Sequence, residues 1–203
     1  MTIPHREPGK RSFREASKET LLFVLHPLVR WLSVMRVRPD TLTVIGWTLA
    51  LCAAVLFGLG YARVAGLVML LGGLFDALDG AVARETNRMS SFGAFLASTL
   101  DRLSEAAVFV GLIFFYAGAD QPYAALLGGV AMTFSLLTSY TRARAEGLNI
   151  SCEVGLLERA GRIVILSTLS IAGLPAVGLG LVAAGALVTT AQRILHVRRA
   201  TRD

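Results

Sequence analysis

Charged residues are scarce in this sequence. Only 17% of its 203 residues are Asp, Glu, Lys or Arg, whereas soluble domains contain about 25%. Hydrophobic residues make up 54% of the chain and form long runs, which excludes an ordinary soluble domain and predicts an all-α integral membrane protein. No polar linker is long enough to separate two domains, so we expect one membrane domain over residues 1–203.

Cysteine and histidine are also rare. Cys52 falls in an apolar run and Cys152 in a polar linker far away in the sequence, so the pair does not predict a structural disulfide. The three histidines lie near the ends of the chain, without the spacing of metal ligands. We therefore expect neither a disulfide framework nor a histidine-based metal site.

Six apolar segments are each near the ~20 residues that a helix needs to cross a bilayer. They lie at about 42–61, 65–84, 93–117, 121–141, 156–174 and 176–196, and they predict a six-helix transmembrane bundle over residues 42–196. Residues 1–12 are charged and interrupted by proline, which predicts a flexible arm. Residues 13–35 mix apolar and basic side chains at helical spacing, which predicts an N-terminal amphipathic helix at the membrane interface.

Positive charge gathers on one side of this predicted bundle. The chain has 20 Lys and Arg residues and a net charge of +6, yet only Arg63 falls in a loop on the predicted outer side. By the positive-inside rule, we expect a multi-pass protein of the inner (cytoplasmic) membrane with its active site facing the cytoplasm. No aromatic-rich or helix-turn-helix pattern accompanies the basic residues, so we expect contact with membrane lipids and no nucleic acid.

Ionisable side chains interrupt the apolar stretch between Asp76 and Asp101. Such groups cost roughly 2.5–3.5 kcal/mol each at membrane depth, so they normally face a partner or a wet cavity. Asp76 and Asp79 are three residues apart and lie on one face of a helix, while Asp101 falls in the next helix. Carboxylates that converge from two antiparallel helices suit hard divalent cations, which commonly bind phosphates.

The same stretch resembles the signature of the CDP-alcohol phosphotransferases (CDP-alcohol phosphatidyltransferases). That signature reads D-x-x-D-G-x-x-A-R, then eight residues, then G-x-x-x-D-x-x-x-D. The matching residues are Asp76, Asp79, Gly80, Ala83, Arg84, Gly93 and Asp101. One position departs from the signature, because Ala97 stands where the third aspartate is expected.

The resemblance implies transfer of a phosphatidyl group from CDP-diacylglycerol, with CMP as the leaving group. It implies a two-metal Mg²⁺ or Mn²⁺ site at Asp76, Asp79, Asp101 and the position of Ala97, and it assigns Asp101 as the catalytic base. The residues implied for the nucleotide and CDP-lipid pocket are Pro39, Asp40, Thr41, Leu42, Thr43, Gly80, Ala83, Arg84, Ser90 and Gly93. The family also implies a homodimer.

Basic residues at the predicted cytoplasmic mouth favour a phosphorylated polyol as the acceptor. The acceptor-phosphate residues we expect are Ser139, Arg142, Arg162 and Arg193. The segments SYTRARAE, GLLERAGR and AQR are similar to those of bacterial phosphatidylinositol-phosphate synthases, which predicts inositol phosphate. Arg142 replaces a lysine typical of that subgroup, and ERAGR replaces ERPER, so glycerol 3-phosphate and phosphatidylglycerophosphate synthesis are the alternative. Serine ranks third, because it would not need so many arginines.

Ala97 bears on activity rather than on family. It lies one helical turn before Asp101, and Ser98 points about 100° away around the helix, so no neighbour replaces the missing carboxylate. We therefore expect weakened metal binding and an impaired enzyme. Two hypotheses stay open: a transferase disabled at position 97 by an engineered or natural change, and a non-catalytic membrane protein that keeps a nucleotide-lipid pocket.

Overall fold

The computed structural model describes residues 25–202, which form helices and short connections with no strand in this part of the chain. A first helix covers residues 25–34. The helices that follow are α2 (Pro39–Gly58), α3 (Ala62–Glu85), α4 (Ser91–Gly118), α5 (Pro122–Glu146), α6 (Arg159–Ile171) and α7 (Pro175–Ala200). The predicted all-α class is confirmed for the described residues. The predicted arm over 1–12, and residues 13–24 of the predicted interfacial helix, lie outside them.

Short connections set the antiparallel order of these helices. Pro39, Pro122 and Pro175 begin α2, α5 and α7, a position where the missing N–H costs nothing. Gly60 and Gly173 follow α2 and α6 with φ of +83° and +81°, the left-handed conformation that commonly ends a helix. Neighbouring helices along the chain therefore run in opposite directions.

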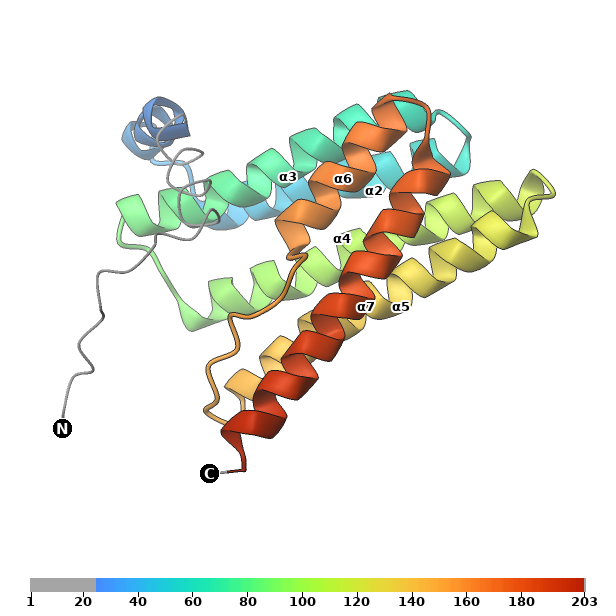
Figure 1. Ribbon diagram of the computed structural model, residues 1–203. Coiled ribbons are helices and arrows are strands. Elements are labelled where there is room, and N and C mark those ends of the chain that lie inside the picture. The colour runs from blue at the N-terminus through green and yellow to red at the C-terminus, as the bar shows by residue number, and fades with distance from the viewer. Residues whose placement is uncertain (1–24, 203) are drawn as a thin grey trace.

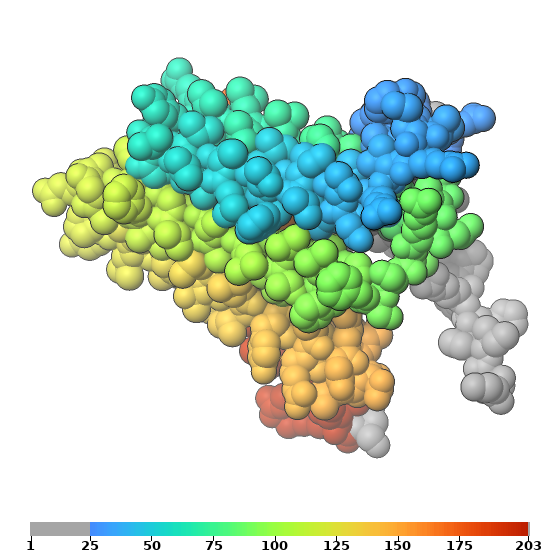
Figure 2. Space-filling view, turned by 180° about the vertical axis from the view of Figure 1, so that it is seen from behind, coloured from blue at the N-terminus to red at the C-terminus, as the bar shows by residue number. Residues whose placement is uncertain are grey.

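The six longer helices pack in a closed order, α2–α3–α6–α7–α5–α4, in which each helix contacts chiefly two neighbours. Figure 1 shows α6 beside α3 and α7 crossing α5. Figure 2 shows α2, α4 and α5 side by side on the opposite face. The buried core includes Phe57, Phe109, Leu112, Leu166 and Leu179, which come from α2, α4, α6 and α7.

Four of the described helices, α2, α3, α5 and α7, are long and apolar enough to cross a membrane. The chain is therefore a multi-pass membrane protein by its helix composition. The six predicted segments all fall on helices, but two of them do not meet this criterion. Helix α4 has 28 residues and carries Asp101, Arg102 and Glu105 near its middle. Helix α6 has only 13 residues, or about 20 Å at 1.5 Å per residue, because residues 147–158 precede it without forming helix.

The helix over 25–34 lies against α3 on its buried face. Leu25 and Val29 are buried in a second apolar cluster with Leu78 and Val82. Trp31 on the same helix is 57% exposed. The described part of this helix thus buries one apolar side against the bundle and leaves Trp31 exposed, and its position at a membrane interface stays a prediction.

Candidate functional site

Two of the predicted metal ligands converge on one guanidinium group. Nη2 of Arg159 lies 2.7 Å from Oδ2 of Asp76 and 3.0 Å from Oδ1 of Asp101. The two aspartates come from α3 and α4, and Arg159 is the first residue of α6. One side chain therefore connects three helices. Nε of Arg159 is buried and has no hydrogen-bond partner among the described residues.

Asp79, one turn after Asp76, is held by a different helix. The hydroxyl of Thr43 in α2 donates a 2.5 Å hydrogen bond to Oδ2 of Asp79, and both side chains are buried. Gly46 lets α2 come this close to α3, because a Cβ there would lie 2.6 Å from Oδ1 of Asp76 and 3.3 Å from the carbonyl oxygen of Gly72. The family signature does not include Gly46. Its place one turn after Thr43 on the same helix was the only available signal.

These carboxylates do not fit a site for two divalent ions as they stand. Ala97 supplies no oxygen, Asp76 and Asp101 face the cation of Arg159, and Asp79 accepts the hydrogen bond from α2. In the described part of the chain, no group of three or more His, Cys, Asp or Glu side chains is placed to hold a metal ion together. Two of the predicted donors, Asp76 and Asp101, are thus brought together from two helices, but the guanidinium of Arg159 lies between them.

A cavity of about 190 Å³ opens beside Asp79, at the start of α2, the end of α3 and the start of α4. Residues predicted for the nucleotide pocket that line it are Pro39, Asp40, Thr43, Gly80, Ala83, Arg84, Ser90 and Gly93. Thr41 and Leu42 do not line it: Thr41 is exposed and Leu42 is buried in the second apolar cluster. The five-residue segment is helical, so only one of its faces can point into a cavity.

Two glycines shape the wall of this first cavity. A Cβ at Gly80 would meet only Nη1 of Arg84, at 3.5 Å, so the backbone of α3 is open there. Ser90 caps α4, and its hydroxyl accepts a hydrogen bond from the Gly93 N–H at 2.9 Å. Arg88 also lines the cavity, although sequence reasoning assigned it no role. Its position between two matched parts of the signature was the signal that could have found it.

A second cavity of about 350 Å³ lies where α4, α5, α6 and α7 meet. Its charged and hydroxyl lining consists of Ser98, Asp101, Arg102, Thr138, Ser139, Arg142, Glu146, Glu158, Arg159, Arg162 and Arg193. All four predicted acceptor-phosphate residues are in this lining, together with the predicted base. Five arginines stand against three acids, so the lining suits an anion.

Arg162 is the most deeply buried of these arginines. Its Nε and Nη2 donate to the two carboxylate oxygens of Glu105 at 2.6 and 2.9 Å. The side chains are only 2% and 6% exposed. Removing either partner would leave an uncompensated buried charge, so this pair holds α4 and α6 together at the wall of the second cavity.

Arg193 and Arg142 differ in how firmly they are engaged. Arg193 donates from Nε to the carbonyl of Val154 at 2.9 Å, and from Nη1 to the carbonyl of Thr138. Arg142 pairs with Glu146 one turn away at 2.8 Å, and these side chains are 42% and 50% exposed. An exposed pair of this kind contributes little to stability. Arg142 can therefore exchange its partner for a ligand phosphate at low cost.

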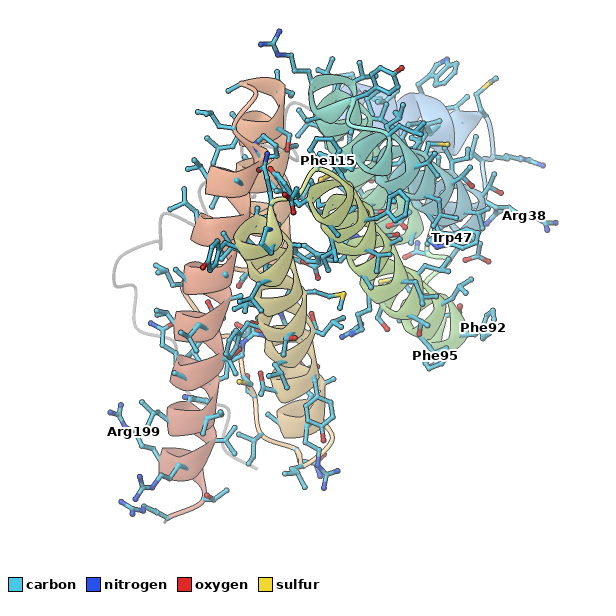
Figure 3. The ribbon with its side chains drawn as sticks, turned by 90° about the vertical axis from the view of Figure 1, so that its right-hand side faces the viewer. Arg38, Trp47, Phe92, Phe95, Phe115 and Arg199 are labelled. Atoms are coloured by element: carbon cyan, nitrogen blue, oxygen red, sulfur yellow. The ribbon has the colours of Figure 1, made fainter. Side chains whose placement is uncertain are left out.

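Helix α4 contributes to both cavities. Ala97 lines the first, and Asp101, one turn later, lines the second. At the start of the same helix, Phe92 and Phe95 point outward from the bundle, at the end where Arg38 also projects (Figure 3). The two phenylalanine side chains are about two-thirds exposed, at 67% and 65%. The first cavity thus opens beside a strongly apolar surface.

Similarity to known proteins covers both cavities. The CDP-alcohol phosphatidyltransferase family model matches residues 36–195. Over 209 residues, the chain is 35% identical to the phosphatidylinositol phosphate synthase of Streptomyces avermitilis, covering 94% of this chain and 84% of that protein. Over 179 residues, it is 34% identical to the archaetidylinositol phosphate synthase of Pyrococcus horikoshii, covering 86% and 91%.

The fold is similar to crystal structures of the phosphatidylinositol phosphate synthase of Mycobacterium tuberculosis. With CDP-DAG bound, that structure gives a TM-score of 0.76 at 32% identity, covering 84% of this chain and 92% of that one. In complex with manganese and citrate, it gives a TM-score of 0.76 at 33% identity, covering 84% and 87%.

Proposed function

Because the chain belongs to the CDP-alcohol phosphatidyltransferase family, we propose that it transfers the phosphatidyl group of CDP-diacylglycerol to inositol phosphate. The products are phosphatidylinositol phosphate and CMP. The observation that carries the proposal is the pair of cavities on either side of one turn of α4, one lined by the signature residues and one by arginines. The two named relatives differ in their lipid, but both names specify an inositol phosphate product.

The first cavity suits the CDP-lipid. Gly80 leaves room for a flat nucleotide against the backbone, and Arg84 and Arg88 supply cations for a diphosphate. The exposed Phe92 and Phe95 lie at this end of α4, where acyl chains in the bilayer can pack on them. A donor with a charged head group and two acyl chains matches a cationic cavity that lies next to an exposed apolar surface.

The second cavity suits the phosphorylated acceptor. Ser139 and Arg142 line it and provide a hydroxyl and an exchangeable guanidinium. Arg162 and Arg193 are committed to protein partners, so in this proposal they contribute positive potential and shape more than direct ligand bonds. The acceptor phosphate then binds at α5 and its hydroxyl points toward α4.

Asp101 would act as the base in this arrangement, since its carboxylate lies in the acceptor cavity. The acceptor hydroxyl oxygen attacks the phosphorus that carries diacylglycerol, and its proton passes to Asp101. A new P–O bond forms as the bond from that phosphorus to the bridging oxygen of the diphosphate breaks. CMP leaves with that oxygen, and Arg84 and Arg88 stabilise its charge.

We extend the proposal to topology and assembly. The start of α2, the end of α3 and the start of α4 surround the first cavity, and the ends near the second cavity carry Arg142, Arg159 and Arg193. Arg63 is the second residue of α3, at the other end of that helix. This distribution supports six helices of one domain crossing the inner membrane, with both cavities open to the cytoplasm. We expect a homodimer, as implied by the family.

An acceptor panel tests the proposed reaction. Purified protein in mild detergent receives CDP-diacylglycerol with inositol phosphate, glycerol 3-phosphate or serine, and the lipid product is identified by mass spectrometry. We expect phosphatidylinositol phosphate. The replacement of lysine by Arg142 favours glycerol 3-phosphate as the second candidate, and preferential formation of phosphatidylglycerophosphate would establish it. CDP-diacylglycerol binding without any product, in this chain and in Ala97→Asp, would favour a non-catalytic binding protein.

A further inference from the structure

The guanidinium of Arg159 stands at the point where the carboxylates of Asp76 and Asp101 converge. Its Nη2 is within 3.0 Å of an oxygen from each. The turn of α4 just before Asp101 carries Ala97, whose side chain has no oxygen that could bind a metal ion. A cation of the protein itself therefore occupies the space between two of the three available carboxylates.

The charge of the site favours fewer metal ions than the two that the signature implies. Asp76, Asp79 and Asp101 carry three negative charges, and Arg159 offsets one of them. The two that are left match a single divalent ion. With a second divalent ion, the positive charges of the ions and Arg159 would outnumber the three carboxylate charges, next to a cavity lined by further arginines. A buried charge without an opposite charge beside it is costly.

We propose that Arg159 takes the place of one divalent ion in this chain, so that the site binds no more than one Mg²⁺ or Mn²⁺. The inference concerns the cation between Asp76 and Asp101 and not the acceptor, so it stands or fails separately from the proposed function.

Two features keep Arg159 between the carboxylates. A guanidinium does not lose its proton in proteins, so Arg159 keeps its positive charge beside Asp76 and Asp101. Arg159 also lines the second cavity, where the guanidinium groups of Arg102 and Arg142 are already present. Turning away from this position would leave the carboxylates of Asp76 and Asp101 facing each other without a cation between them. A metal ion that binds both aspartates must therefore first displace Arg159.

Mn²⁺ binding measures this competition without any turnover. Electron paramagnetic resonance of free Mn²⁺ gives the number of bound ions and their affinity for purified protein. We expect no more than one tight ion in the unmodified chain, and two would overturn the proposal. This count needs no variant, so it tests the inference even if a substitution at position 159 prevents folding.

Arg159→Gln removes the competing cation, and Arg102→Gln is its matched control. Arg102 lines the same cavity and neighbours Asp101, but its guanidinium donates to the carbonyl oxygen of Ser98. Because a site blocked by its own side chain binds with reduced apparent affinity, we expect Arg159→Gln to tighten Mn²⁺ binding by about tenfold or more. Arg102→Gln should change it much less. An Arg159→Gln protein that elutes as a single species and binds Mn²⁺ no more tightly than Arg102→Gln would overturn the proposal.

Discussion

Glu105 of α4 and Arg162 of α6 form a bidentate ion pair, 2.6 and 2.9 Å in its two hydrogen bonds, with almost no exposure to solvent. These residues are 57 positions apart in the sequence. Arg162 lines the second cavity, and the pair fixes the helix that also carries Arg159. The position of the cation in the site therefore depends on a buried contact outside the family signature.

Glu105→Gln tests this pair, because it keeps the shape of the side chain and removes its charge. Breaking a buried pair from one side costs about 3–5 kcal/mol, so we expect a large fall in thermal stability in detergent. Glu146→Gln is the control, since its pair with Arg142 is half exposed and such pairs contribute about 0–1 kcal/mol. Equal melting shifts for the two variants would contradict the structural role of Glu105.

Gly46 is expected to tolerate no side chain. A Cβ at this position would lie 2.6 Å from Oδ1 of Asp76, so Gly46→Ala must push α2 from α3 or move the carboxylate. Overpacking of this kind costs about 1–3 kcal/mol. Gly129→Ala is the control, because a Cβ there meets nothing within 4 Å and alanine favours the helix. Thermal unfolding of both variants checks the prediction, and a Gly46→Ala protein as stable as Gly129→Ala would contradict it.

Arg142 should matter for the acceptor and not for the CDP-lipid. It lines the second cavity, whereas Arg144 is exposed and lies outside both linings. A hydrogen bond to a charged group contributes about 1.5–3 kcal/mol, or about 10–100-fold in affinity. We therefore expect Arg142→Ala to raise the KM for inositol phosphate by about tenfold or more, with the KM for CDP-diacylglycerol little changed.

Arg144→Ala removes the same charge from the same helix and should leave both constants near their original values. If the two variants raise the KM for inositol phosphate equally, a general loss of positive potential explains the effect, and the proposed contact at Arg142 is wrong.

The first cavity could be anticipated because its residues belong to one fixed spacing. Asp79, Gly80 and Arg84 share a helix, and Gly93 follows after a short loop, so local geometry alone gathers them. Helical periodicity also explains the exception at Leu42, which turns into the apolar cluster instead. For these residues, the spacing along the sequence is enough to predict that they lie close together in the fold.

The ion contacts of α6 could not be anticipated in this way. Arg159 reaches Asp76 across 83 positions, and this contact depends on how α3, α4 and α6 pack. The signature contains no residue of α6. The positive-inside rule predicts only on which side of the membrane an arginine lies, and not which carboxylate it contacts. The short length of α6 was missed for a related reason, because residues 147–158 include apolar side chains although they do not form helix.

The most direct test of the account is CMP release from CDP-diacylglycerol and inositol phosphate by this chain, by Ala97→Asp, and by Ala97→Asp with Asp101→Asn. Partners that only orient a metal ligand are worth about 10–100-fold in affinity or activity, so restoring a ligand at position 97 should raise turnover by at least about tenfold in Mg²⁺ or Mn²⁺. Adding Asp101→Asn should abolish it. Turnover that Ala97→Asp does not improve, or that survives Asp101→Asn, would contradict the roles assigned to positions 97 and 101.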